Sequence, residues 1–403
     1  MRILHTSDWH LGRSFHGASL LDEQAEAAER IVELAAEHQV ELVVVAGDLF
    51  DRAIPPAPAV ELLDATLARL RTTGARVAAI SGNHDSAVRV RMHDRLLNEL
   101  GVALRGDAAR VAEPLVLAAP ADGGPPVAVY LVPFLEPSVD APVLAALGPA
   151  APHGPDHEAD GPGRATHDGA LRLATARIRE HLASLGPARS VVVAHAFVAG
   201  GRVSDSERDL SVGGSDRVAE AAFDGFHLVA LGHLHAPQEV AGPRLAYSGS
   251  PLPYSFSEEG QEKSVRIVDL APDGSVHAEV VALGAGRPVR TLTGPLEELL
   301  ADPAHAGAEA ARVRARLTDA HLPNQAMARL RQRFPHALEL RHEPPGRVDA
   351  GQAPARQMAE LEAASPLDLA LRFWADQQGA EPTDAEAALL ERAVAATSLG
   401  SGG

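Results

Sequence analysis

Seven side chains with metal-binding chemistry follow directly after apolar stretches of this 403-residue sequence. They are Asp8, His10, Asp48, Asn83, His195, His233 and His235. Carboxylate and amide oxygens combined with imidazole nitrogens, without sulfur, suit Mn²⁺, Fe²⁺ or Zn²⁺. The chain has no cysteine, which excludes thiolate metal sites, cysteine nucleophiles and disulfides. The residue types therefore predict a transition-metal site built from His, Asp and Asn.

The number of donors indicates two ions rather than one. Seven ligands are more than a single ion takes when it binds roughly four to six. One carboxylate shared between two ions resolves the excess, and Asp48, which follows the central strand of the predicted sheet, is the natural bridge. Two ions about 3.5–4 Å apart stabilise the attacking and leaving oxygens of an in-line phosphoryl displacement. The pattern therefore predicts a phosphoester hydrolase.

A layered α/β domain has to position these donors. We expect strands at 3–7, 41–46, 76–81, 127–132, 190–194 and 226–231, and helices at 20–38, 58–73 and 170–185. The carboxyl ends of adjacent strands converge on one crevice, so the donors that follow them should meet. If the chain is extended after the strands, Asp8 and His10 point the same way, and so do His233 and His235. Each motif alone is compatible with an ordinary turn, but five at strand ends indicate one site.

Outside these strands and helices, the sequence predicts a loop, several short β segments and three smaller regions after the main domain. Residues 148–169 read as a surface loop rich in Pro, Gly, His and Asp, and 238–282 as short β segments. We expect a main domain at 1–284, a small α+β domain at 285–342, a Pro/Gly/Ala-rich linker at 343–365 and a helical hairpin at 366–403. In the small domain, strands are predicted at 289–292, 311–318 and 337–341, with helices at 295–301 and 324–334.

Charge and hydropathy limit the possible partners. The net charge of −18 argues against nucleic-acid binding through bulk positive charge. Residues 311–341, however, hold seven arginines against two acids, and Arg329, Arg331 and Arg333 are candidate DNA contacts. No apolar run approaches ~20 residues, which excludes a membrane span. The N-terminal residues pass directly into a strand pattern without a secretory apolar region, so we expect a cytoplasmic protein.

The motifs together resemble the signature of calcineurin-like metallophosphoesterases. Asp8-Trp9-His10, Gly47-Asp48, Gly82-Asn83-His84-Asp85, His195 and Gly232-His233-Leu234-His235 carry the likeness. The opening residues 1–12 and the segments 204–208 and 247–251 are similar to one branch, the SbcD nuclease subunits related to Mre-type nucleases. This resemblance implies a two-sheet α/β/β/α sandwich with a small α+β capping domain and a C-terminal helical hairpin.

The resemblance also implies roles for the site residues. One ion would be held by Asp8, His10, Asp48 and His235, and the other by Asp48, Asn83, His195 and His233. His84 would not be a ligand but the group that protonates the leaving oxygen, with the carboxylate of Asp51 orienting it. The implied cofactors are two divalent metal ions, and Mn²⁺ is the ion that the resemblance favours.

The implied function is a DNA nuclease for repair, replication and recombination. Such an enzyme acts as exonuclease on duplex ends and endonuclease on single strands and hairpins, in an ATP-gated complex with an SbcC-like SMC-type ATPase. We expect the C-terminal hairpin to bind that partner through Leu371, Phe373 and Trp374. The resemblance further suggests a homodimer within a heterotetramer and a nucleoid-associated location.

Two other functions fit the same fold class. One is a small-molecule cyclic-nucleotide phosphodiesterase or phosphatase, and the other is a non-enzymatic scaffold with a vestigial metal site. The complete donor set argues against a scaffold. The basic segment 311–341 and the terminal hairpin argue against a small substrate, which needs neither.

Overall fold

The computed structural model describes residues 1–117, 122–148, 166–207, 217–345, 365–378 and 381–398. The chain divides into two compact units. The first comprises residues 1–292, 302–315 and 327–340, and the second comprises residues 293–301, 316–326 and 341–403. Among the described residues, no helix is long and apolar enough to cross a membrane.

The first sheet of the larger unit has six strands in the order β16-β15-β1-β4-β5-β6. These strands are β1 (Arg2–Thr6), β4 (Leu42–Val45), β5 (Arg76–Ile80), β6 (Val102–Arg105), β15 (Ser264–Leu270) and β16 (Val276–Ala282). The strands β1, β4, β5 and β6 run parallel, and β15 pairs antiparallel with β1. The parallel strands are buried along almost their whole length, because both faces of the sheet are covered.

The second sheet has the order β13-β14-β12-β9-β8-β7. Its strands are β7 (Leu115–Leu117), β8 (Val127–Val132), β9 (Arg189–His195), β12 (Leu228–Gly232), β13 (Gln238–Glu239) and β14 (Leu245–Tyr247). The strands β8, β9, β12 and β14 are parallel, with antiparallel strands at both edges. The sheet therefore also brings several strand ends to one edge.

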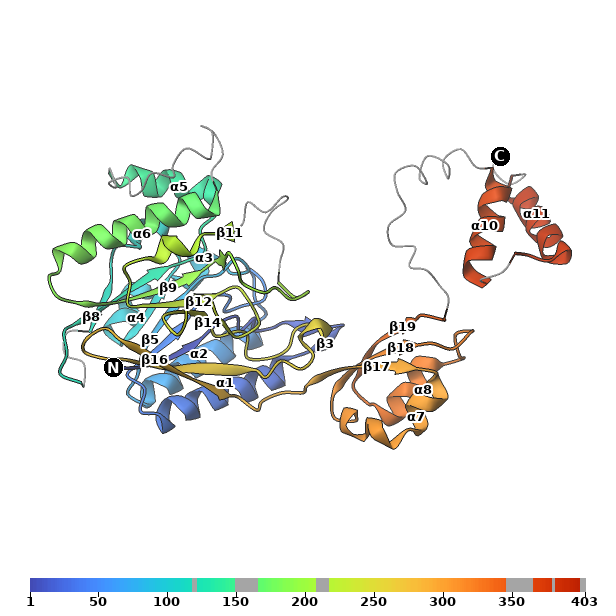
Figure 1. Cartoon of the computed structure of the whole chain (residues 1–403), viewed down its shortest axis with the longest axis horizontal. Coiled ribbons are helices and arrows are strands. Elements are labelled where there is room, and N and C mark those ends of the chain that lie inside the picture. Colours follow the sequence, from blue (N-terminus) through green and yellow to red (C-terminus); the bar gives the residue numbers. More distant parts are fainter. Residues whose placement is uncertain (118–121, 149–165, 208–216, 346–364, 379–380, 399–403) are drawn as a thin grey trace. The chain divides into compact units, whose positions relative to one another are not determined.

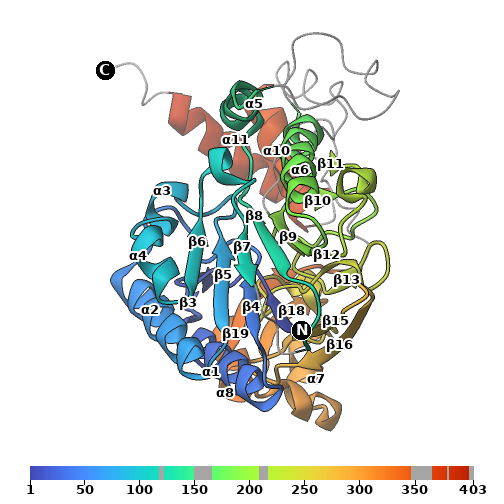
Figure 2. The ribbon, with the colours of Figure 1, turned by 90° about the vertical axis from the view of Figure 1, so that its left-hand side faces the viewer.

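The two sheets face each other, and helices cover their outer faces (Figure 2). Apolar side chains of β1, β4 and β5 pack against those of β8, β9 and β12 in the central core. Helices α1 (Leu21–Glu37) and α2 (Ala57–Thr72) cover the first sheet, while α5 (Pro137–Ala146) and α6 (His167–Ser184) cover the second. These four layers are the α/β/β/α sandwich that the resemblance implies.

Short elements complete this unit. They are β2 (Ser14–Phe15), β3 (Ala18–Ser19), α3 (Ala87–Val90), α4 (Asp94–Glu99), η1 (Ala108–Arg110), β10 (Phe197–Val198), β11 (Arg217–Val218), η2 (Glu220–Phe223) and η3 (Phe256–Glu258). The β2–β3 hairpin and η3 share an apolar cluster that contains Phe15, Leu252 and Phe256. This cluster lies next to the residues that follow β1.

A three-stranded sheet follows in the order β17-β18-β19, formed by Val289–Gly294, Arg312–Leu317 and Ala337–His342. The helices α7 (Leu296–Ala301), η4 (Pro303–Ala308) and α8 (Ala326–Arg333) connect its strands. Two further helices, α10 (Pro366–Gln378) and α11 (Asp384–Ser398), pack against each other (Figure 1). The elements of the predicted α+β part and of the predicted hairpin are therefore present.

Three predictions for individual segments need correction or restriction. The predicted loop 148–169 is too long, because α6 begins at His167, where the hydroxyl of Thr166 accepts a hydrogen bond from the Gly169 amide. The 238–282 stretch contains β15 and β16, paired over seven residues each, rather than only short segments. Residues 149–165 of the loop and 346–364 of the linker lie outside the described part of the chain.

Candidate metal centre

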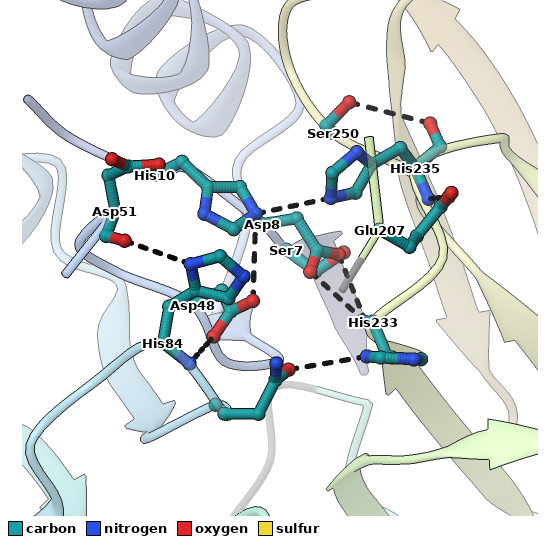
Figure 3. A network of polar contacts seen from close by, with 12 residues as sticks. Ser7, Asp8, His10, Asp48, Asp51, His84, Glu207, His233, His235 and Ser250 are labelled. Carbon is teal, nitrogen blue, oxygen red and sulfur yellow. Dashed lines mark hydrogen bonds and ion pairs between the residues drawn. The ribbon is translucent and has the colours of Figure 1, made fainter. Parts of the chain in front are cut away.

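All seven predicted donors lie together where strands of both sheets end. Figure 3 shows Asp8, His10, Asp48, His233 and His235 of this group. Asp8 and His10 follow β1, Asp48 follows β4 and Asn83 follows β5 in the first sheet. His195 ends β9, and His233 and His235 follow β12 in the second sheet. Six of the seven are buried, and Asn83 is half-buried. The edge shared by the two sheets therefore carries a site that neither sheet could form alone.

The chain does not reach this site in the extended conformation that we predicted. The backbone φ angles are 54° at Asp8, 46° at His10, 50° at Asp48 and 107° at His233. Such left-handed conformations cost a non-glycine residue about 1–2 kcal/mol. They are common where a functional site fixes the backbone. The donors converge through tight turns, and the side-chain alternation of a strand does not continue beyond the strand ends.

Glycines let the two sheets approach each other at this edge. A Cβ atom on Gly82 would overlap the Asp48 carboxylate, and one on Gly232 would overlap the carbonyl oxygen of Ala46. A side chain at either position would displace β4 or the loop that carries Asp48. These glycines therefore set the spacing of the donors.

Asp48 lies between the histidines of the two sheets. Its Oδ2 is 3.5 Å from His10 Nε2 and 3.6 Å from His195 Nε2. On one side, His10 Nε2 is 3.1 Å from His235 Nε2, and Asp8 belongs to the same group. On the other side, Asn83 Oδ1 is 2.9 Å from His195 Nε2 and 3.3 Å from His233 Nδ1. This is the arrangement expected when one carboxylate serves two neighbouring sites.

The cluster buries two carboxyl groups without enough positive charge to balance them. Burial, together with the negative charge of Asp48, raises the pKa of Asp8 well above its usual value, and burial also raises the pKa of Asp48. Burial lowers the pKa of His10 and His235 far below normal and that of His195 to about 3. Burial thus favours the neutral form of these three imidazoles, which then do not balance the two carboxylates. A bound cation would reverse both effects.

The orientation of the donors fits divalent ions. His195 Nδ1 donates to the Ala46 carbonyl at 2.9 Å, so its Nε2 carries a lone pair and faces the Asn83 carbonyl oxygen. Two electron-pair donors face each other there, an arrangement that a cation between them would stabilise. His10 Nδ1 and Asn83 Nδ2 are buried without a hydrogen-bond partner among the described residues. The residues present thus match the metal that the fold implies.

His84 lies at the rim of this cluster. Its ring is 4.7 Å from that of His10, and its backbone amide donates to Asp48 Oδ1 at 2.9 Å. His84 Nδ1 is 2.8 Å from the main-chain oxygen of Asp51. The prediction therefore named the wrong group of Asp51. The main-chain oxygen contacts the ring, whereas the carboxylate lies 3.6 Å from Arg13 Nη1. His84 is also close enough to His10 and Asp48 to count as a third donor there.

Several residues around the cluster were not predicted from the sequence. Ser7 donates to Asp8 Oδ2 at 2.5 Å, and Asp85 accepts the amides of Leu49, Phe50 and Gly82, which holds the loop around Asp48. Ser206 and Glu207 contact His235. All four lie in segments that carry the resemblance, which assigned none of them a role.

The predicted DNA-binding arginines all belong to α8. Arg331 is exposed, and its Nε donates to the Ala337 carbonyl, while Arg329 and Arg333 are half-buried. Arg333 pairs with Glu309 at 3.2 Å. Elsewhere in the basic stretch, Arg312 is buried and pairs with Glu23, and Arg316 pairs with Glu343. Acids from outside residues 311–341 thus neutralise part of the charge counted there.

The predicted partner-binding residues all belong to α10. Phe373 is 67% exposed, whereas Leu371 and Trp374 are half-buried. Leu369 on the same helix and Leu389 on α11 are exposed as well. The helix pair therefore keeps apolar surface that its own packing does not cover.

Comparison with known proteins agrees with this site. Residues 1–147 match the calcineurin-like phosphoesterase family, and residues 285–378 match the Type 5 capsule protein repressor C-terminal domain family. The chain is 36% identical over 303 residues to the SbcD subunit of the SbcCD nuclease of Bacillus subtilis strain 168, covering 72% of this chain and 71% of the relative.

Two solved structures are more distant. The Thermus thermophilus protein TT1561 is 14% identical with a TM-score of 0.38, and the match covers 69% of this chain and 98% of that one. A dimetal phosphatase from Danio rerio is 12% identical with a TM-score of 0.36, covering 70% of this chain and 96% of that one.

Proposed function

Because this chain belongs to the SbcD family of nuclease subunits, we propose that its metal centre hydrolyses DNA phosphodiester bonds with two divalent ions, Mn²⁺ in the first place. The proposed activities are those of a double-strand exonuclease and a single-strand and hairpin endonuclease. The observation that carries the proposal is the position of Asp48 between the donors of both sheets. Acting on DNA would place the protein at the nucleoid, in the cytoplasm.

In this proposal, Asp8, His10, Asp48 and His235 hold one ion, and Asp48, Asn83, His195 and His233 hold the other. Bound divalent ions supply Lewis-acid stabilisation of phosphoryl oxygens and a nucleophilic water of lowered pKa.

His84 acts beside the ions rather than on them. Its Nδ1–H, held by the Asp51 carbonyl, leaves Nε2 as the ring atom that can meet the scissile phosphate. A protonated Nε2 there would give its proton to the leaving oxygen. Asp51 positions the ring through its main chain.

We further propose that an SbcC-like SMC-type ATPase binds the α10–α11 pair and gates the nuclease. The exposed apolar side chains of that pair support this assignment. DNA would contact α8, where Arg331 is the most exposed of the three candidate arginines. In domain terms, residues 1–284 would form the nuclease, 285–342 the DNA-capping domain, 343–365 the linker and 366–403 the partner-binding hairpin.

A homodimer within a heterotetramer is part of the same proposal. Val88, Met92, Leu96 and Leu100 are exposed at intervals of four residues around α3 and α4. A second copy of the chain would cover these side chains, and light scattering measures whether the purified protein is a dimer. The alternative, a small-molecule phosphodiesterase or phosphatase, gives no role to the match over residues 285–378.

Asp48→Asn tests the proposal most directly. The substitution removes charge from both proposed ion sites while keeping the shape of a residue at a strand end. We expect loss of Mn²⁺ binding and of activity on both DNA and a nitrophenyl phosphodiester, with an unchanged far-UV spectrum. Asp64→Asn, on the outer face of α2, is the matched control. Substantial activity in Asp48→Asn would exclude the dinuclear site.

A further inference from the structure

A buried hydrogen-bond chain leads from the only lysine of the protein to the proposed metal ligand His235. Lys263 Nζ donates to Glu258 Oε2. Glu258 Oε1 lies 2.7 Å from Ser206 Oγ, and Ser206 Oγ lies 2.6 Å from His235 Nδ1. All four residues are buried. Neither the metal centre nor the acid assigned to His84 uses the first three of them.

The direction of the protons in this chain follows from the partners. A carboxylate only accepts hydrogen bonds, and Glu258 already accepts one from the Lys263 ammonium through Oε2. The hydroxyl proton of Ser206 is therefore drawn toward Glu258. Ser204, whose Oγ is 2.8 Å from Ser206, has its own carboxylate acceptor in Glu207, also at 2.8 Å. Ser206 is left as the acceptor for His235, which requires a proton on His235 Nδ1.

The main chain of His235 is fixed by the same group of residues (Figure 3). Glu207 accepts its amide at 2.8 Å, and Lys263 donates to its carbonyl at 2.9 Å. The Ser250 amide also donates to that carbonyl, at 3.1 Å. The segments 204–208 and 247–251, which the sequence marked without a role, thus both hold His235.

We propose that Ser206 and Glu258, supported by Lys263, are positioning residues that keep His235 in the tautomer protonated at Nδ1. The lone pair of Nε2 then faces His10 and the proposed ion site. Metal-bound histidines commonly use their second nitrogen in this way. His10 has no such support, because its Nδ1 lacks a partner among the described residues. The inference rests on the proposed metal centre.

The tautomer can be measured directly in the wild-type protein. In metal-free protein with ¹⁵N-labelled histidine, long-range proton–nitrogen NMR spectra distinguish a protonated Nδ1 from a protonated Nε2. His235→Gln identifies the signal by its loss. We expect protonation at Nδ1. A neutral His235 protonated at Nε2 would overturn the proposal, whatever the variants do.

Metal affinity tests the consequence. Titration of metal-free protein with Mn²⁺ should show about 10–100-fold weaker binding at one of two sites in Ser206→Ala and Glu258→Gln. Ser206→Thr keeps a hydroxyl and should restore most of the affinity, and Glu262→Gln, an exposed neighbour of Lys263, should not alter it. If Ser206→Ala binds Mn²⁺ as tightly as the wild type, the hydrogen-bond chain has only a structural role, whether or not the melting temperature falls. If Asp48→Asn also binds Mn²⁺ normally, the metal centre itself is wrong, so the two failures are distinguishable.

Discussion

Asp48 and His84 illustrate how neighbouring residues divide the work of a hydrolytic site. Asp48 is buried between histidines of both sheets, whereas His84 lies at the rim and is half-buried. One hydrogen bond joins them, from the His84 amide to Asp48 Oδ1. A change at His84 should therefore affect proton transfer, while a change at Asp48 should affect the ions.

The first prediction separates those roles. His84→Ala should keep both ions, because Asn83 and not His84 is the proposed ligand, yet lose roughly 10²–10⁴ in rate as expected for a general acid. Metal analysis and nitrophenyl diester hydrolysis, run on the same preparation, measure the two effects. Asn83→Ala is the control that should lose an ion. Loss of one ion in His84→Ala would make His84 a ligand, in line with its closeness to His10 and Asp48.

At the residue scale, the sequence revealed the donors but not their supports. Polar residues that follow apolar strands stand out in the sequence, so the seven side chains that meet in this cluster could be named from it. Glu258 and Ser206 lie 52 residues apart and resemble surface-loop residues until the fold brings them together. The Asp51 contact to His84 uses a main-chain oxygen, which no side-chain pattern reveals.

At the element scale, a buried arginine joins the two sheets at the edge opposite the metal centre. Arg189 on β9 is buried and donates to the carbonyl of Leu270 on β15 at 2.9 Å. Asp122 pairs with the same guanidinium through both carboxylate oxygens, at 2.6 and 3.0 Å. One arginine thus bridges the sheets, and one carboxylate neutralises it.

The second prediction uses the pH dependence of that pair. The hydrogen bonds from Arg189 hold the pKa of Asp122 well below its usual value. The stability that this provides is present above about pH 4 and is lost as pH falls further. Asp122→Asn should lower the free energy of unfolding by about 1.5–3 kcal/mol at pH 7. The difference in the free energy of unfolding between the variant and the wild type should become smaller below about pH 4, where the wild-type carboxyl takes up a proton.

Urea unfolding of metal-free protein between pH 7 and pH 3 measures this gap. The control is Asp269→Asn, which breaks a half-exposed pair with Arg2 and should cost about 1 kcal/mol or less. A gap for Asp122→Asn that stays constant with pH would show that the ionised carboxylate is not what stabilises this edge.

The third prediction concerns α8. Arg329→Gln with Arg331→Gln should weaken DNA binding and make its log–log salt dependence shallower by about 0.9 for each lost phosphate contact. Nitrophenyl diester hydrolysis should not change. Arg333 is left in place because it pairs with Glu309. Arg69→Gln, an exposed arginine on α2, is the control, and equal losses on both substrates would assign α8 a structural role only.

Strands were predicted more closely than short helices, for a physical reason. A strand covered on both faces is a continuous apolar run, so β4, β5 and β8 could be located to within about one residue. Helices α3 and α4 have four and six residues, too few for a helical period to show in the sequence. Their exposed apolar side chains also blur any pattern.

At the scale of the whole molecule, sequence charge alone is a poor guide to a binding surface. The arginines of residues 311–341 look like one basic segment, but Arg312 is buried against Glu23, far away in the sequence. Such pairing depends on the fold and cannot be counted along the chain. Exposure of apolar groups is more direct evidence, since it records what the described chain leaves uncovered.

The last prediction concerns α10 and α11. Deleting residues 366–403 should leave the melting temperature and nitrophenyl diester hydrolysis of the remaining chain unchanged, because the sandwich has its own complete core. Binding to an SbcC-like ATPase in a pull-down should fall sharply, since each large apolar side chain buried at an interface contributes about 1.5–3 kcal/mol. ATP-stimulated degradation of duplex DNA should fall with it.

Point variants make that test specific. Phe373→Ser removes the most exposed aromatic group of α10 and should reproduce much of the binding defect, whereas its exposed neighbour Arg372→Gln should not. Both variants keep the full chain, so any loss of partner binding would reflect the surface itself. If the truncated protein instead melts at a lower temperature, exposes hydrophobic surface and still binds the ATPase, the helices cover the chain's own core. The partner must then bind elsewhere.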